Sequence, residues 1–470
     1  MKKTKIVTSI GPASNTPDIF EQMVLAGANV ARINFSHATE QEKQQAVATV
    51  KEVRRRTGKT IAIMYDTKGP ELRNGLMVDD GVTLSEGNLV RIVRQTVVGD
   101  EHRFSLNHAQ AIDNMQVDNI VLLENGLMEL RVVSIEADGV TCRVLKGGYF
   151  GSHKSISVPG VFLNLPFISE ADREDIKYAC HHDGDFLACS FVSTADDIRE
   201  VRQLLAEEGR SDMRVIAKIE NLHGMDNLND ITAAADGIMV ARGDLGVEAP
   251  MEDLPIYQKR IVSTCRRYGK VCIIATEMLE SMKHNVRPTR AEVTDIANAV
   301  YLGADAVMLS GETTTGDYPV EAVRYMARIC EHIEESHEYS NIFAKTKATT
   351  IAEAMCYNVA ESANELNAKV IIVPTKKGVS ARLISNLAPI CPIVALTFDD
   401  AIAQGLTLNY GVYTIGIKDL YYSLDHILEM SKKMVADEFN LHPGDIVIIS
   451  GGFHARPVGA ETNFMKIDVV

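Results

Sequence analysis

Cations and carboxylates able to act together on a phosphate group follow several short apolar runs of this 470-residue chain. Lys218 and Glu220 stand two residues apart in the run 214–221, so in a strand both side chains point to the same side. Asp244 ends the next run, 237–244, and adjacent parallel strands bring its carboxylate to the same edge. Two carboxylates, completed by water and substrate oxygens, are what proteins usually contribute to a magnesium site. A lysine beside such a site stabilises negative charge on a phosphoryl group during transfer.

The same residues also have simpler structural explanations. Glu220 and Asp244 could each pair with a neighbouring Arg or Lys, and Lys218 could be a buried lysine in an ion pair. Gly243, in the Arg-Gly-Asp step at 242–244, either offers free backbone N–H groups to a carboxylate or phosphate, or meets the needs of a tight turn. The spacing alone leaves these alternatives open.

Further polar side chains end similar runs, and together they predict a metal-bridged polyanion, most simply a phosphate. They are Arg32, Asn34, Ser36, Asp66, Thr67, Lys68, Arg73, Ser190, Asn221, Arg242, Thr276, Glu277, Ser310 and Glu312. Four of them carry oxygen ligands of low total charge, which suit a monovalent cation: Asn34, Ser36, Asp66 and Thr67. Taken alone, these four are better explained as polar residues that cap the ends of the strands. The chain has no G-x-x-x-x-G-K-[ST] motif and no G-x-G-x-x-G that opens a helix, so a nucleotide must be held without either fingerprint.

Eight apolar runs with amphipathic helical segments between them predict an α/β fold, a (β/α)8 TIM barrel whose catalytic mouth lies at the carboxyl ends of the strands. The runs are 5–12, 29–37, 61–70, 185–193, 214–221, 237–244, 271–278 and 306–313. Helices are expected at 17–25 with Thr16 as the N-cap, at 40–57 before Gly58, and at 195–209.

Two other regions differ from the barrel in their pattern of apolar and polar residues. Residues 71–165 alternate apolar and polar positions between Gly and Asp-Gly turns, and predict an inserted all-β lid domain of antiparallel strands over the barrel mouth. Residues 341–470 predict a C-terminal α/β domain with an open sheet, and the polar segment 337–350 is the expected linker. The barrel domain then comprises 1–70 and 166–340.

The composition excludes several classes of protein. Hydrophobic residues make up 46% of the chain and charged residues 24%, which excludes a disordered or fibrous protein. The net charge of −15, with no basic run longer than 54–56, argues against nucleic acid or an anionic membrane as partner. Because no export signal or 18-residue apolar stretch is present and the eight Cys residues form no C-x-x-C pair, we expect a cytoplasmic protein with reduced thiols.

Eight motifs, in order, resemble those of the pyruvate kinase family, and with the β insertion and the terminal α/β domain the resemblance covers nearly the whole chain. They are T-S-I-G-P-A-S (8–14), A-R-I-N-F-S-H (31–37), D-T-K-G-P-E-L-R (66–73), I-A-K-I-E-N (216–221), I-M-V-A-R-G-D-L-G-V-E (238–248), A-T-E-M-L-E-S-M (275–282), R-P-T-R-A-E-V-T-D-I-A-N-A-V (287–300) and M-L-S-G-E-T (308–313). In length the chain resembles bacterial members of the family.

The resemblance implies that a phosphoryl group passes from phosphoenolpyruvate to ADP, giving pyruvate and ATP. It implies Mg²⁺ or Mn²⁺ on Glu220 and Asp244, with Lys218 stabilising the phosphoryl group in flight and Arg32 holding the same phosphate from the opposite side. The enolate that remains needs a proton on carbon, and Thr276 with water is the candidate relay.

The resemblance also implies ligand roles around the mouth. The backbone at Gly243 and Asp244, with Thr276, would hold the pyruvate carboxylate, and Arg73 and the lid residue Lys154 would face the nucleotide phosphates. A potassium ion would be held by the four oxygen ligands Asn34, Ser36, Asp66 and Thr67.

The terminal domain resembles the allosteric domain of the family. Its loop 375–382 is expected to cradle a sugar-phosphate or nucleotide effector, with the segment 450–459 closing over it, although an ordinary α/β turn also explains the loop. The expected effector residues are Thr375, Lys376, Lys377, Gly378, Ser380 and Arg456. Family members use the helix after 287–292 near a subunit contact, so the resemblance implies a homotetramer.

The chain departs from the family pattern at four places. Ala38 stands where glycine is usual, Glu277 where glutamine is common, and E-N-G at 124–126 replaces an acidic D-D-G in the lid. The lysines at 376–377 lie in a loop that is usually richer in Ser and Thr. The first three departures touch none of the expected metal or phosphate ligands, whereas the two lysines are themselves expected effector residues.

Two other classes of function fit part of the pattern. A barrel lyase or aldolase acting on pyruvate-like enolates also uses Glu and Asp on adjacent strands, but it needs no lid, potassium site or ADP. A non-catalytic metabolite-sensing module is opposed by the intact Lys218, Glu220 and Asp244. Metal-dependent formation of ATP from phosphoenolpyruvate and ADP discriminates among the three.

Overall fold

The computed structural model describes residues 1–36, 38–336, 348–417, 424–452 and 462–470. Eight parallel strands close into a barrel, and each lies within one of the eight apolar runs, so the predicted (β/α)8 architecture is confirmed. In pairing order they are β1 (Lys5–Ser9), β16 (Ala306–Leu309), β15 (Val271–Ala275), β14 (Gly237–Ala241), β13 (Arg214–Ile219), β12 (Phe186–Cys189), β3 (Ala62–Asp66) and β2 (Val30–Asn34).

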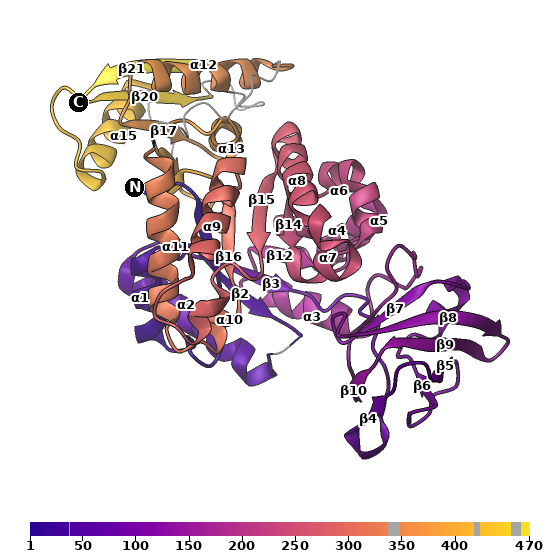
Figure 1. Ribbon diagram of the computed structural model, residues 1–470. Coiled ribbons are helices and arrows are strands. Elements are labelled where there is room, and N and C mark those ends of the chain that lie inside the picture. The colour runs from indigo at the N-terminus through magenta and orange to yellow at the C-terminus, as the bar shows by residue number, and fades with distance from the viewer. Residues whose placement is uncertain (37, 337–347, 418–423, 453–461) are drawn as a thin grey trace.

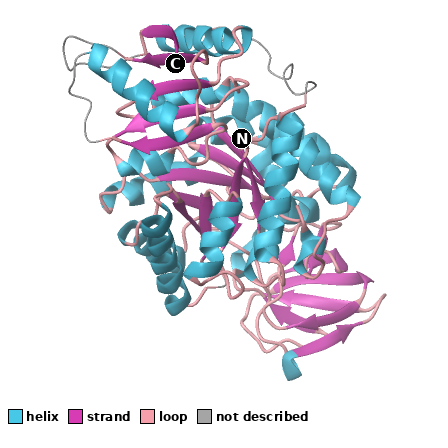
Figure 2. Cartoon of the chain, turned by 90° about the vertical axis from the view of Figure 1, so that its left-hand side faces the viewer, coloured by secondary structure: helices cyan, strands magenta, loops and turns pink. Residues whose placement is uncertain are grey.

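Helices cover the outside of the barrel strands, as Figure 2 shows. The capping box of Thr39 and Glu42 begins the second helix, and Gly58 in the left-handed conformation ends it. Thr16 precedes the first helix as expected but accepts no capping hydrogen bond, and the fourth helix ends at Glu207. The helices are α1 (Pro17–Ala26), α2 (Glu40–Thr57), α3 (Glu170–His181), α4 (Ala195–Glu207), α5 (Leu222–Asp226), α6 (Leu228–Ala234), α7 (Arg242–Glu248), α8 (Leu254–Tyr268), α9 (Arg290–Leu302), α10 (Gly311–Thr314) and α11 (Pro319–Glu334).

The chain between β3 and α3 forms a β domain with its own hydrophobic core, beyond one end of the barrel (Figure 1). Its main sheet has the order β11-β7-β8-β9-β5-β6, and β10 pairs with β4. The expected antiparallel pairing holds except between β5 and β6, which are parallel. The strands are β4 (Gly81–Leu84), β5 (Leu89–Val93), β6 (Arg103–Ser105), β7 (Ile120–Leu123), β8 (Met128–Glu136), β9 (Gly139–Lys146), β10 (Gly148–Gly151) and β11 (Ile156–Ser157).

The C-terminal region is an open five-stranded sheet of order β19-β18-β17-β20-β21, with β21 antiparallel to β20. Figure 1 places it at the opposite end of the barrel from the β domain. Its elements are α12 (Ile351–Glu365), β17 (Val370–Pro374), α13 (Val379–Asn386), β18 (Ile393–Thr397), α14 (Asp400–Gly405), β19 (Val412–Gly416), α15 (Leu424–Glu438), β20 (Ile446–Gly451) and β21 (Phe464–Val469). Within the described part of the chain, no helix is long and apolar enough to cross a membrane.

The C-terminal domain is packed into the barrel. Leu408, fully buried between α14 and β19, belongs to the same hydrophobic cluster as the inward-facing barrel residues Val7, Ala62 and Ile273. The backbone N–H of Thr4 donates to Glu334 of α11 (2.6 Å) at the same end. The barrel interior is thus closed on the side away from the β domain, which leaves the carboxyl ends of the strands as its open mouth.

Candidate active site

A cavity of about 400 Å³ lies between the barrel mouth and the β domain. Side chains from the barrel strands and from the β domain both line it, as expected for a lid over a catalytic mouth. The lining comprises Arg32, Asn34, Ser36, Lys68, Glu71, Arg73, Glu124, Asn125, Lys154, Ser155, Ser190, Phe191, Lys218, Glu220, Met239, Ala241, Asp244, Thr276, Met308 and Ser310.

Asp66, fully buried at the end of β3, holds two cations of this cavity. Its Oδ2 accepts from Arg32 Nε at 2.6 Å, and its Oδ1 accepts from Lys218 Nζ at 3.0 Å. Burial by itself would raise the pKa of Asp66, but Arg32 and Lys218 together hold it below its ordinary value. Ser9 of β1 also accepts from Arg32 (2.8 Å), so the guanidinium is fixed from two strands. The carboxylate therefore orients both cations at the mouth.

Lys218 is almost completely buried and lies between two carboxylates. Its Nζ is 2.9 Å from Glu220 Oε1 and 3.0 Å from Asp66 Oδ1, and it donates to Ser190 Oγ at 2.7 Å. Burial opposes its charge, yet Asp66 and Glu220 raise the pKa of Lys218 above its ordinary value. The amine therefore stays protonated near neutrality, as a group that stabilises negative charge must be.

Glu220 is fully buried, and its second oxygen, Oε2, accepts from the backbone N–H of Phe191 at 2.6 Å. Burial raises the pKa of Glu220 to about 7, which Lys218 opposes and the nearby negative charge of Asp244 reinforces. Asp244 is exposed on α7 and, among the described residues, makes no side-chain hydrogen bond or ion pair. The two carboxylates thus repel each other beside one cavity, an arrangement that a bound cation relieves.

The donor set fits a divalent cation of the magnesium type. In the described part of the chain no cluster of three His, Cys, Asp or Glu side chains is placed to hold a metal, so an all-protein cage is absent there. Glu220 and Asp244 contribute two carboxylates to the lining of the cavity, which matches the few protein ligands that Mg²⁺ accepts beside water and substrate oxygens.

Gly243 and Thr276 contact each other directly. The Gly243 N–H donates to Thr276 Oγ1 at 2.8 Å, so this backbone donor is already engaged where the sequence suggested a free one. Thr276 and Glu277 both have left-handed backbones, with φ of 69° and 55°, which is strained for a β-branched residue such as threonine. Arg242 donates to the Thr276 carbonyl at 2.6 Å and holds this bend in place.

The four expected potassium ligands lie on two paired strands and their extensions. Asn34 stands opposite Asp66 in the β2–β3 register, and its Oδ1 accepts from the Ser36 N–H at 3.0 Å. Thr67 Oγ1 accepts from the Ser190 N–H at 3.2 Å. The structure therefore brings the four residues to one corner of the mouth, with several of their oxygens bonded to protein donors.

Both cations expected to face a nucleotide are paired with carboxylates. Arg73 Nη2 lies 2.8 Å from Glu71 Oε2, and Lys154 Nζ lies 2.7 Å from Glu124 Oε1. All four side chains line the cavity. Glu124 belongs to the E-N-G step at 124–126, so this departure places a carboxylate on the cation Lys154.

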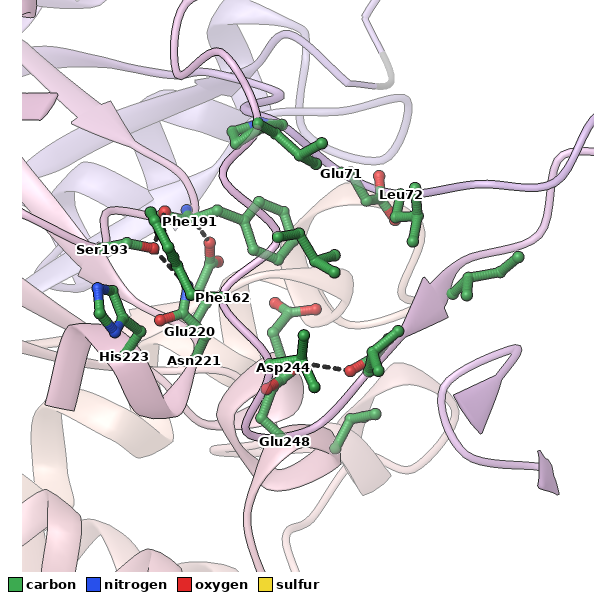
Figure 3. Close-up of a pocket in the computed structure, with 18 of the residues that line it drawn as sticks. Glu71, Leu72, Phe162, Phe191, Ser193, Glu220, Asn221, His223, Asp244 and Glu248 are labelled. Carbon is green, nitrogen blue, oxygen red and sulfur yellow. Dashed lines mark hydrogen bonds between the residues drawn. The ribbon is translucent and has the colours of Figure 1, made fainter. Parts of the chain in front are cut away.

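A second, smaller cavity of about 150 Å³ is drawn in Figure 3. Its lining shares Glu220 and Asp244 with that of the first cavity. One wall is the strap, which we define as residues 155–167, the segment that returns the chain from the β domain to the barrel. The opposite wall is formed by α5 and α7, from which His223 and Glu248 line the cavity. Its lining includes five carboxylates and no Lys or Arg, whereas the larger cavity is rich in both charges.

In the C-terminal domain, the loop 375–378 joins β17 to α13 as expected. The Gly378 N–H donates to Thr375 Oγ1 at 2.9 Å, and Ser380 is hydrogen bonded to Thr462 at 2.5 Å between their hydroxyl oxygens. Lys376 and Lys377 are exposed. Arg456 lies outside the described residues.

Of three further contacts at the mouth, those of Ser9 and of the Phe191 backbone were missed as functional candidates, whereas Ser190 was expected there from the sequence. Ser190 bridges Lys218 and Asp66, Ser9 anchors Arg32, and the Phe191 N–H, on a left-handed backbone (φ 57°), anchors Glu220. Ser9 lies at the end of the strand expected within the run 5–12, which is the signal that could have found it. The Phe191 backbone donor carries no side-chain signal.

The chain is similar over its whole length to known proteins. The chain matches two family models, the pyruvate kinase barrel domain over residues 1–323 and the pyruvate kinase alpha/beta domain over residues 353–468. It is 41% identical to a pyruvate kinase of Geobacillus stearothermophilus, over all of this chain and 80% of that protein, and 40% identical to one of Bacillus licheniformis, over all of this chain and 81% of that protein. A crystal structure of a pyruvate kinase from Cryptosporidium parvum superimposes with a TM-score of 0.93 at 35% identity, covering all of this chain and 96% of the other.

Proposed function

This chain belongs to the pyruvate kinase family of phosphotransferases, and on that premise we propose that it transfers the phosphoryl group of phosphoenolpyruvate to ADP, giving pyruvate and ATP. The observation that carries the proposal is the buried Lys218 ammonium, held between Asp66 and Glu220 beside the exposed Asp244. This is a preorganised positive charge at the place where a phosphoryl group would be in flight, and it needs no rearrangement during the reaction.

In this proposal Glu220 and Asp244 hold Mg²⁺ or Mn²⁺, which supplies charge neutralisation to the phosphate and to the enolate oxygen when bound. Lys218 stabilises the transferred phosphoryl group, and Arg32 binds the same phosphate from the β2 side, where Asp66 and Ser9 hold its guanidinium. Both cations are anchored before substrate arrives, so they position the phosphate as well as neutralise it.

In this proposal Thr276 binds the carboxylate of the substrate and takes part in protonating its enolate. Its hydroxyl now bonds the Gly243 N–H and the Ala275 carbonyl (2.6 Å), and substrate binding would exchange the first of these bonds for one to the pyruvate carboxylate. The backbone of Gly243 and Asp244 then becomes available to the same carboxylate. With water, the Thr276 hydroxyl would return a proton to the enolate carbon.

The remaining assignments rest on the family and on placement at the mouth or in the terminal domain. Arg73 and Lys154 bind nucleotide phosphates from the lid side, and K⁺ occupies the corner formed by Asn34, Ser36, Asp66 and Thr67. An allosteric sugar-phosphate or nucleotide effector binds the loop of Thr375, Lys376, Lys377, Gly378 and Ser380.

We also propose a cytoplasmic homotetramer, divided at the expected boundaries into a barrel (1–70 and 166–340), a lid (71–165) and an effector domain (341–470). All eight cysteines are buried and none forms a disulfide, which supports a reducing compartment. Separate hydrophobic cores in the lid and the terminal domain support the division.

A coupled turnover assay with phosphoenolpyruvate, ADP and Mg²⁺ tests the proposal, run with and without K⁺ and titrated with sugar phosphates and AMP. We expect metal-dependent ATP formation. Borohydride with pyruvate should trap no adduct, because the protonated Lys218 amine does not form a Schiff base. Absence of ATP formation would favour a sensing module, and trapping at Lys218 would favour an aldolase.

A further inference from the structure

The carboxylate of Glu248, on α7, binds the strap that joins lid and barrel, and we call this contact the clasp. Val158 to Val161 forms a tight turn, closed by a hydrogen bond from the Val161 N–H to the Val158 carbonyl (3.1 Å), with Pro159 second and Gly160 at φ 74° third. Glu248 accepts a hydrogen bond from the Ser157 hydroxyl just before the turn, and its carboxylate lies beside the Gly160 N–H within the turn. The carboxylate thus engages both sides of this turn.

The strap belongs to the body of the lid. Ile156 and Val158 are buried in the hydrophobic core of the β domain, and Leu163 and Leu165 pack against it. A contact made by this segment with the barrel therefore reports whether the lid is docked.

The helix that receives the clasp carries the candidate metal ligand Asp244. Glu248 is the last residue of α7 and lies four residues after Asp244, one helical turn along the same face, as Figure 3 shows. A helix of seven residues is unstable by itself. Arg242 fixes its first turn through Thr276, and Leu245 is its one buried residue, so Glu248 supplies the attachment of its last turn.

A second contact between the strap and the barrel lies close in sequence to the other candidate metal ligand, Glu220. Phe162 of the strap stacks on His223 of α5 with ring centroids 4.3 Å apart, and His223 lies three residues after Glu220. Glu220 is anchored inside the barrel by Lys218 and the Phe191 N–H. Asp244 has no comparable anchor among the described residues, so its position depends on α7.

We propose that Glu248 is a positioning residue: by clasping the strap it couples docking of the lid to the orientation of Asp244, and so to the affinity of the site for a divalent cation. The inference rests on the proposed function for the identity of the cation site, but its test does not need turnover.

The test is Mn²⁺ binding to the purified protein without substrates, followed by the electron paramagnetic resonance signal of free Mn²⁺. Ser157→Ala removes one hydrogen bond of the clasp and no charge, and we expect it to weaken Mn²⁺ binding about three- to tenfold. Glu248→Ala should weaken binding at least as much. Glu248→Gln keeps an acceptor oxygen and should lie between Glu248→Ala and the parent protein.

The relative Mn²⁺ affinities of these variants distinguish a positioning role of Glu248 from an effect of its negative charge alone. If Glu248 acted only as a negative charge near the cation, Gln and Ala would weaken binding equally and Ser157→Ala would have no effect, which would overturn the inference. Glu252→Gln is the matched control, because it removes an exposed carboxylate just beyond α7 and should leave Mn²⁺ binding unchanged.

Phe162→Trp adds a direct readout of docking, because the chain contains no tryptophan. We expect Mg²⁺ to change its fluorescence, and the change to be lost with Ser157→Ala. A protein that binds Mn²⁺ as expected but forms no ATP would refute the proposed function and leave this inference standing. Conversely, ATP formation by the parent protein together with unaltered Mn²⁺ binding in Ser157→Ala would refute this inference and leave the proposed function standing.

Discussion

Lys218 and Asp66 are joined by a 3.0 Å ion pair across the barrel mouth, although their strands, β13 and β3, do not pair with each other. The strand between them, β12, is followed by Ser190, whose hydroxyl accepts from Lys218 at 2.7 Å and donates to Asp66 at 3.3 Å. Because a buried charge is costly unless it is paired, this bridge fixes the ammonium at one point.

Lys218→Met should lower the rate of ATP formation by about 10²–10³, the usual loss when one preorganised transition-state contact is removed. Metal-dependent exchange of the pyruvate methyl protons with D₂O should be partly retained, because that step transfers no phosphoryl group. Coupled turnover and proton NMR measure the two rates. Lys177→Met, which removes a half-exposed lysine of α3, is the control. Equal loss of both activities in Lys218→Met would show that Lys218 is structural.

Glu124→Gln should lower the KM for ADP about two- to fourfold without changing the KM for phosphoenolpyruvate. In the structure Glu124 neutralises Lys154 at 2.7 Å, and nucleotide phosphates must replace it. The gain is small because partly exposed ion pairs contribute only about 0.2–1 kcal/mol. Initial-rate kinetics at low and high salt measure it, with Glu101→Gln, an exposed lid carboxylate, as control. A raised KM for ADP would mean that Glu124 helps to bind the nucleotide.

Leu408→Ala should destabilise the protein by about 2–5 kcal/mol, because this fully buried side chain packs into the closed end of the barrel and leaves a cavity when shortened. Urea unfolding followed by circular dichroism measures the loss. Leu366→Ala, at a 40% exposed position of the same domain, should change the stability by no more than about 0.5 kcal/mol. Similar small effects in both variants would show that Leu408 is not part of the barrel core.

Asp305→Asn should reduce the fall in stability that accompanies rising pH. Burial raises the pKa of Asp305 to about 6, although N–H donors from Cys272 and Tyr410 favour its charged form. Between its unfolded value near 3.8 and about 6 the folded protein binds more protons than the unfolded chain, so stability decreases as the pH rises.

The contribution of Asp305 is on the order of 3 kcal/mol when the shift is converted to free energy. Unfolding free energies measured between pH 4.5 and 7 should therefore fall less steeply in the variant. Asp118→Asn, at an exposed lid position, should keep the parent slope. Identical slopes in all three proteins would place the pH dependence elsewhere.

Patterns confined to short stretches of sequence predicted the architecture. Continuous apolar runs such as that around β15 suit strands buried on both faces, and eight of them with helices between match a barrel. Gly58 marked the end of α2 because a glycine in the left-handed conformation ends a helix through its own local backbone geometry. Lys218 and Glu220 could be placed on one side of a strand for the same reason, since strand periodicity is local.

Tertiary structure alone decided the contacts among distant segments. Asp66 and Lys218 are 152 residues apart in sequence, and only the strand order and barrel closure bring them together. The bond from the Gly243 N–H to Thr276 depends on the left-handed bend after β15, and the clasp of Glu248 depends on where the lid returns to the barrel. Local periodicity sets which way a side chain points, but the partner that it meets is set by the path of the whole chain.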